Sequence, residues 1–102
     1  MKIDCYLSEH CGSFYELREN LEKALQELQL AADVEFHTLS YEEAVALEVK
    51  GSPTIRVDGK DLFEATGSAG IFCRAYPDIS GKVKNAPSYL QLKERLGMFR
   101  GN

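Results

Sequence analysis

The chain has no apolar run that approaches the roughly 20 residues a helix needs to cross a membrane. Its first residues, Met1 to Asp4, also lack the apolar core of a secretory signal peptide. We therefore predict a cytoplasmic protein without a membrane partner. Structural disulfides are rare in that compartment.

Cysteine is scarce and odd in number, because 102 residues contain only three, which do not form a closed disulfide framework. No two of them are spaced as Cys-x-x-Cys, the pattern of structural zinc sites and of dithiol redox motifs. In a reducing compartment we expect Cys5, Cys11 and Cys73 each to be buried, reactive or metal-binding.

The chain also has no excess of positive charge. Its net charge of −4 disfavours nucleic acid and anionic membranes as partners. The sequence contains no glycine-rich phosphate loop and no serine protease or metalloprotease signature, and it predicts no cofactor. Because repeats, low-complexity runs and linkers are absent too, we predict one domain over residues 1–102.

The residues that are present predict alternating strands and helices in the first half of the chain. Residues 2–8 place apolar side chains on one face of a strand. Residues 12–30 carry leucines at helical spacing with charges opposite, which predicts a long amphipathic helix. A second strand is expected at residues 34–39.

The middle of the chain carries two local signals. Ser40 and Glu43 have the spacing of a capping box, which predicts a short helix that ends at about Val49. Pro53 then precedes the apolar run 54–57. Proline cannot donate to a sheet ladder, so it belongs at the first residue of a strand, at an edge or in a tight turn.

The remaining residues predict a hairpin, a long connection and a last helix. Asp58 and Gly59 form a two-residue loop before the strand-like residues 60–63, which is a strong hairpin signal. Residues 64–86, rich in glycine, read as a connection whose length indicates either a functional loop or a missed element. Pro87 fits the first position of the last helix.

The resulting order, β-α-β-α-β-β-α, predicts an α/β fold with a central mixed four-stranded sheet flanked by helices. The first two strands, joined through a helix, should run parallel. The closing hairpin should add an antiparallel strand.

Cys11 lies where the first strand gives way to the long helix, the end of a sheet at which α/β proteins bind ligands. A helix N-terminus favours the thiolate over the thiol. His10 would add positive charge when protonated, and Gly12 would let another backbone approach closely. Two interpretations stay open for Cys11: a reactive thiolate or a small apolar residue at a helix cap. His10 either stabilises the Cys11 thiolate by its positive charge or is a solvated loop residue.

A second thiol is missing three residues after Cys11, where Phe14 stands. A one-cysteine site forms mixed disulfides but cannot resolve them locally. Cys5 is mid-strand and fits core packing. Cys73, beside Arg74, whose charge favours a thiolate, fits a reactive or a structural role equally.

Several stretches of the chain carry a family resemblance: Glu9–Gly12, Gly51–Asp61, Cys73–Tyr76, and Gly81 with Ala86–Ser88. Together they resemble small bacterial thioredoxin-like proteins, some of them labelled alkylmercury-lyase-like or uncharacterised. The resemblance spans nearly the whole chain, and its most specific part is the Gly-Ser-Pro-Thr segment.

The resemblance implies a thioredoxin-like fold in which Pro53 is cis and faces Cys11, and in which Cys73 corresponds to a second recurrent cysteine. We therefore predict thiol–disulfide redox chemistry, with Cys11 as the attacking thiolate and Cys73 as the resolving thiol. A protein disulfide, a protein thiol or a small thiol would be the partner. The residues predicted to shape the substrate groove are Ser52, Pro53, His10, Gly12 and Arg74.

Two other functions stay open from the residues. Cys11 and Cys73 could bind a soft metal such as mercury, copper or zinc, since thiolates select soft metals; a zinc site that adds Cys5 and His10 lacks the usual spacing. Alternatively the domain is a non-catalytic module that binds a protein or forms a homodimer. Aromatic residues that fit either such a surface or the core are Tyr41, Phe63, Tyr76 and Phe99.

Overall fold

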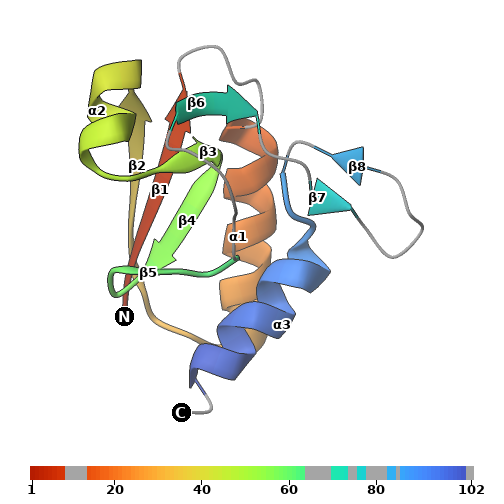
Figure 1. Ribbon diagram of the computed structural model, residues 1–102. Helices are drawn as coiled ribbons and strands as arrows, with labels where there is room; N and C mark the ends of the chain where they lie inside the picture. The colour runs from red at the N-terminus through yellow and green to blue at the C-terminus, as the bar shows by residue number, and fades with distance from the viewer. Residues whose placement is uncertain (9–13, 64–69, 74–75, 78–82, 85, 101–102) are drawn as a thin grey trace.

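The computed structural model describes residues 1–8, 14–63, 70–73, 76–77, 83–84 and 86–100. Its elements, in chain order, are β1 (Lys2–Ser8), α1 (Phe14–Leu28), β2 (Asp33–Leu39), α2 (Tyr41–Ala46), β3 (Lys50–Ser52), β4 (Thr54–Val57), β5 (Lys60–Asp61), β6 (Gly70–Cys73), β7 (Tyr76–Pro77), β8 (Val83–Lys84) and α3 (Tyr89–Arg100) (Figure 1). Of the helices in this part of the chain, none has the length and apolarity that a membrane span requires.

The central sheet has four strands in the order β2-β1-β4-β5. Strand β2 runs parallel to β1, whereas β4 is antiparallel to β1 and β5 is antiparallel to β4. The predicted α/β class and mixed four-stranded sheet are therefore confirmed. The hairpin turns at Asp58 and Gly59, whose φ angles of 51° and 86° suit a two-residue turn of type I′.

The two faces of the sheet pack differently. Helices α1 and α3 lie together on one face and enclose the main core (Figure 1). Its fully buried residues from β1, β4 and these two helices are Ile3, Cys5, Leu7, Leu17, Leu21, Ala24, Ile55, Val57, Leu92 and Leu96. On the opposite face α2 covers one end of the sheet, where Leu39, Ala44 and Val49 pack with Tyr6.

The segment 64–86 contains β6, β7 and β8, so of the two interpretations that its length allowed, missed elements are present. Strand β6 pairs in parallel with β3, Gly70 beside Lys50 and Cys73 beside Ser52, with a register shift between these two pairs. Strands β7 and β8 form a separate antiparallel pair. The sequence did not place these strands because the partner of β6 lies about twenty residues upstream, beyond the reach of local turn signals.

Helix α2 begins as predicted and ends early. Its capping box, Ser40 with Glu43, is present. The helix stops at Ala46 instead of Val49 because Glu48 turns left-handed, with φ 56°. The N–H of Val49 then donates back into the last turn, as in a Schellman ending.

Helix α3 also begins later than predicted. The Ser88 N–H donates to Gln91 Oε1 at 2.9 Å, and the Gln91 N–H donates to Ser88 Oγ at 3.3 Å. This reciprocal pair is a capping box, so Ser88 is the N-cap and Pro87 precedes it. The placement of Pro87 at the first helical position was wrong, because the Ser-x-x-Gln spacing was the stronger signal.

Replacing Gly97 with alanine should stabilise the fold. Gly97 lies inside α3, and a Cβ there would lie 3.9 Å from Leu28 Cδ2, an ordinary contact. Glycine in a helix interior costs about 0.5–1 kcal/mol relative to alanine, so Gly97→Ala should raise the free energy of unfolding by that amount in urea denaturation.

The matched control is Gly59→Ala. No described atom lies within 4 Å of a Cβ at Gly59, but its φ of 86° strains any other residue. This variant should therefore be less stable than the parent. A gain in stability from both substitutions would contradict these assignments.

Candidate functional site

The end of β1 is held by a buried side-chain hydrogen bond. The antiparallel register that pairs Tyr6 with Thr54 would place Ser8 opposite Ser52, but β4 begins only after Pro53. The Ser8 N–H donates instead to Ser52 Oγ at 3.0 Å, and both residues are buried. A serine hydroxyl thus replaces a ladder partner for a buried amide, which would be costly to leave unpaired.

The turn beside this bond is equally enclosed. The Ser52–Pro53 peptide bond is cis, as the resemblance implied, and Pro53 is fully buried. The Thr54 hydroxyl donates to the Gly51 carbonyl oxygen at 2.6 Å. Gly51 has a φ of 105°, a backbone conformation that glycine adopts readily.

Strand β6 brings a second predicted site residue to this turn. Cys73, the last residue of β6, is the register partner of Ser52. Neighbouring strands lie about 4.8 Å apart, so the backbone of Cys73 lies next to Ser52 and hence near the end of β1. The structure therefore brings together Ser52, Pro53 and the backbone of Cys73. The other predicted site residues, His10, Cys11, Gly12 and Arg74, lie outside the described residues and stay predictions.

Cys5 is excluded from thiolate chemistry near neutral pH. Its side chain is fully buried in the main core, as predicted. Burial, and to a smaller degree the charge of Asp4, raises the pKa of the Cys5 thiol from 9.0 to about 12. The zinc alternative that included Cys5 is disfavoured by this burial.

A polar cluster that sequence reasoning missed lies on the face of the sheet away from α1. The His37 Nε2 lies 2.9 Å from Asp4 Oδ1 and 3.7 Å from Glu35 Oε2. Ligand atoms of these three residues lie within 4.8 Å of one another, close enough to share a cation. However, the Lys2 ammonium lies 2.9 Å from Glu35 Oε1, and that contact raises the pKa of Lys2. The cluster is thus accounted for as an ion-pair network.

The signal for this cluster was the strand alternation itself. Asp4 is the register partner of Glu35, and Tyr6 is the partner of His37. Parallel pairing places alternate polar residues of both strands on one face. Without knowing the register, the sequence could not bring together side chains 33 residues apart.

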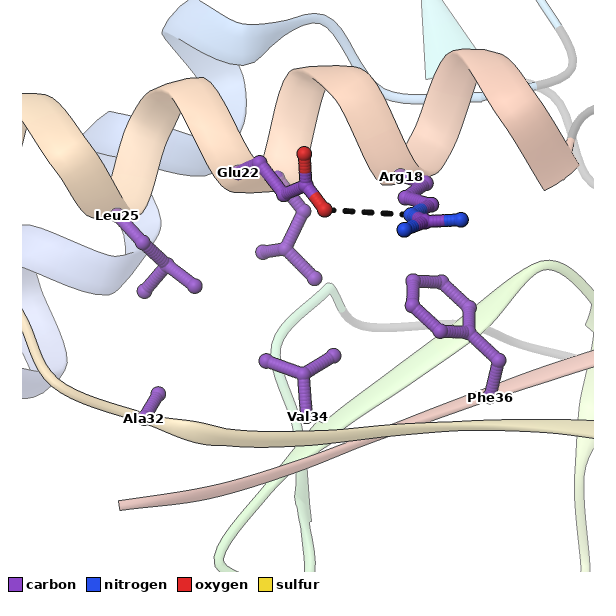
Figure 2. A pocket seen from close by; sticks show the side chains of 7 residues that line it. Arg18, Glu22, Leu25, Ala32, Val34 and Phe36 are labelled. Carbon is purple, nitrogen blue, oxygen red and sulfur yellow. Dashed lines mark hydrogen bonds and ion pairs between the residues drawn. The ribbon is translucent and has the colours of Figure 1, made fainter.

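A groove of about 450 Å³ lies between α1 and β2 (Figure 2). An ion pair between Arg18 and Glu22, with a separation of 3.2 Å, crosses its helix side. The apolar residues that line the groove are Leu21, Leu25, Ala32, Val34 and Phe36. Its two charged side chains are paired with each other, and no cysteine, serine or histidine lines it among the described residues.

The aromatic residues proposed for a binding surface divide between surface and core. Tyr41 is 59% exposed, whereas Phe63 and Phe99 pack partly buried against the main core. The side chain of Tyr76 lies outside the described part of the structure. Of these four residues, Tyr41 is the one whose side chain the structure shows to be largely exposed.

In comparisons with known proteins, no family model, curated protein or solved structure matches this chain. Function is therefore inferred from the site itself. The residues that carry it are Ser8, Ser52 and Cys73, at one end of the sheet.

Removing the Ser52 hydroxyl should destabilise the fold. In Ser52→Ala the buried Ser8 N–H loses its partner, and an unsatisfied buried donor costs about 1–3 kcal/mol. Urea denaturation measures the loss, and hydrogen exchange at the Ser8 amide should accelerate. The control is Ser40→Ala, which removes an exposed cap worth about 1 kcal/mol and should leave exchange at Ser8 unchanged. Unaltered exchange at Ser8 in Ser52→Ala would contradict this role.

The burial of Cys5 predicts a pH dependence of stability. The folded state holds the thiol proton up to about pH 12, whereas the unfolded thiol releases it near the reference value of 9.0. The unfolded state therefore binds fewer protons in this window, and stability falls as the pH rises through it. Relative to Cys5→Val, the unfolding free energy of the parent should decrease from about pH 9 upward. If the unfolding free energies of the two proteins change with pH in parallel, burial does not raise the pKa of the Cys5 thiol.

Proposed function

We propose that the protein is a thiol–disulfide redox protein of thioredoxin-like fold, in which Cys11 attacks and Cys73 resolves. One observation carries the proposal: Cys73 lies in register with Ser52, whose hydroxyl binds the amide of Ser8 at the end of β1. Cys11 follows Ser8 by three residues.

The strand arrangement supports the fold part of the proposal. The order β2-β1-β4-β5, with a parallel first pair and an antiparallel hairpin, is the arrangement that a thioredoxin-like sheet requires. Helices α1 and α3 on one face and α2 on the other agree with it. Strands β3 and β6 form an additional two-stranded sheet at the proposed site.

The length of the chain allows the two thiols to meet. Three residues span at most about 10 Å, and the backbone of Cys73 lies about one strand spacing, 4.8 Å, from Ser52. A disulfide requires Cα atoms within about 7 Å. Cys11 therefore has enough chain to reach Cys73, whereas Cys5 is buried in the main core.

The chemistry has two exchange steps. The Cys11 thiolate attacks one sulfur of a substrate disulfide, which forms a mixed disulfide and releases the other sulfur as a thiolate. The Cys73 thiolate then attacks Cys11 Sγ in that mixed disulfide, and the second substrate thiolate leaves. The substrate gains two electrons, Cys11 and Cys73 become a disulfide, and an external thiol reductant restores them.

Alkylation rates test the proposal. In the full chain we expect Cys11 to react with iodoacetamide with an apparent pKa well below the usual thiol value of about 8.5. Mass spectrometry assigns the modified residue, and Cys11→Ser should abolish the fast reaction. Cys73→Ser should leave the fast reaction but make mixed disulfides with a small disulfide persist. A Cys11 thiol that titrates normally and forms no mixed disulfide would overturn the proposal.

The same pair of thiols also suits a soft metal. Copper(I) or mercury(II) titration, followed by the thiolate–metal absorbance, distinguishes this alternative. If the wild type binds metal far more tightly than the Cys11→Ser, Cys73→Ser double variant and forms no disulfide under oxidants, metal binding replaces the redox function.

A further inference from the structure

We propose that two copies of the chain pair through the outer edge of β2, antiparallel and around a two-fold axis at Phe36. Strand β2 is the first strand of the order β2-β1-β4-β5, so its outer edge has no partner among the described residues (Figure 1). The inference goes beyond the proposed redox function and does not depend on it.

The two edges of the sheet differ in how they are protected. The edge strand β5 has only two residues, and short edge strands resist pairing with other chains. Strand β2 has seven residues in continuous register with β1, without a bulge, a proline or a lysine. Short length, a bulge, proline and lysine are thus absent as protection of this edge, and its charged residues, Asp33 and Glu35, restrict which register a partner strand can take.

The direction of the free backbone groups follows from one hydrogen bond. The Asp33 N–H donates to the Met1 carbonyl oxygen at 2.9 Å. The backbone N–H and C=O groups of Asp33, and of every second residue after it, therefore point toward β1. The N–H and C=O groups of Val34, Phe36 and Thr38 therefore point outward. These are the groups that a partner strand must engage.

Charge distinguishes three symmetric pairings, those with the axis at Val34, Glu35 or Phe36. An axis at Phe36 places Glu35 opposite His37 of the second copy. The carboxylate can accept a hydrogen bond from the imidazole, and the two groups form an ion pair when the imidazole is protonated. An axis at Val34 would set Glu35 against Asp33, and an axis at Glu35 would set two glutamates together. Like charges directly opposite are destabilising, so the Phe36 register is favoured.

In the Phe36 register the outward backbone N–H and C=O groups of β2 form hydrogen bonds, and an apolar surface becomes covered. Phe36 pairs with its own copy and Val34 with Thr38, so each pair exchanges both of its backbone hydrogen bonds. Val34 and Phe36 are partly exposed at the groove between β2 and α1 (Figure 2). A second copy would bring Phe36 against Phe36 there, and it would leave the end of the sheet at Ser52 and Cys73 open.

Sedimentation of the full chain under reducing conditions, which exclude a disulfide-linked dimer, tests this pairing. We expect a concentration-dependent dimer. Thr38→Pro removes an outward N–H that β1 does not use, and it should weaken dimerisation at least about tenfold. The matched control, Thr38→Ala, keeps that N–H and should still dimerise. A wild type that stays monomeric, or equal dimerisation of the two variants, would overturn the proposal.

Charge reversal tests the register separately. Glu35→Lys sets an ammonium group opposite His37, and His37→Glu sets two glutamates opposite each other, so each variant alone should dimerise weakly. Mixed in equal amounts, the two variants restore one attractive pair on each side of the axis and should form heterodimers. Circular dichroism verifies that each variant is folded. Folded variants whose mixture remains as monomeric as its parts would refute the Phe36 register.

Discussion

Strand β1 forms backbone hydrogen bonds on both sides, with β2 through one set of alternate residues and with β4 through the other. Its side chains alternate as well: Ile3, Cys5 and Leu7 enter the main core, whereas Lys2, Asp4 and Tyr6 lie on the opposite face of the sheet. Strands β2, β3, β4 and β6 all contact this strand. At its end the ladder to β4 stops, and the Ser8 amide binds the Ser52 hydroxyl instead. That substitution fixes β3 beside β1, and β3 in turn positions β6 and Cys73.

Features encoded by neighbouring residues could be predicted from the sequence. The capping box of Ser40 and Glu43 and the turn at Asp58 and Gly59 depend only on local backbone chemistry, and both are present. The burial of Cys5 followed from strand alternation in the same way. These signals were enough for the α/β class and for the mixed sheet.

Features that depend on register or on competition between signals could not be predicted. The β3–β6 pairing and the contact between Asp4 and His37 join residues far apart in the chain, and only the folded register aligns them. The end of α2 was missed because nothing in the apolar pattern marks Glu48 as left-handed. In the candidate site, the sequence pointed to Ser52 and Pro53, but the hydroxyl's role toward Ser8 required the register of β4. The proposed thiol chemistry and the proposed dimer contact involve different residues, since the dimer contact lies along β2.

In the proposed thiol pair, β1, Ser52 and β6 bring the backbone of Cys73 near the end of β1, which Cys11 follows by three residues. Peptide mapping by mass spectrometry after mild oxidation of the full chain tests this pair. We expect a cross-linked peptide containing Cys11 and Cys73 in protein of monomer mass, which a dithiol reductant removes. Oxidised protein in which both cysteines remain free, or are joined only between chains, would contradict it.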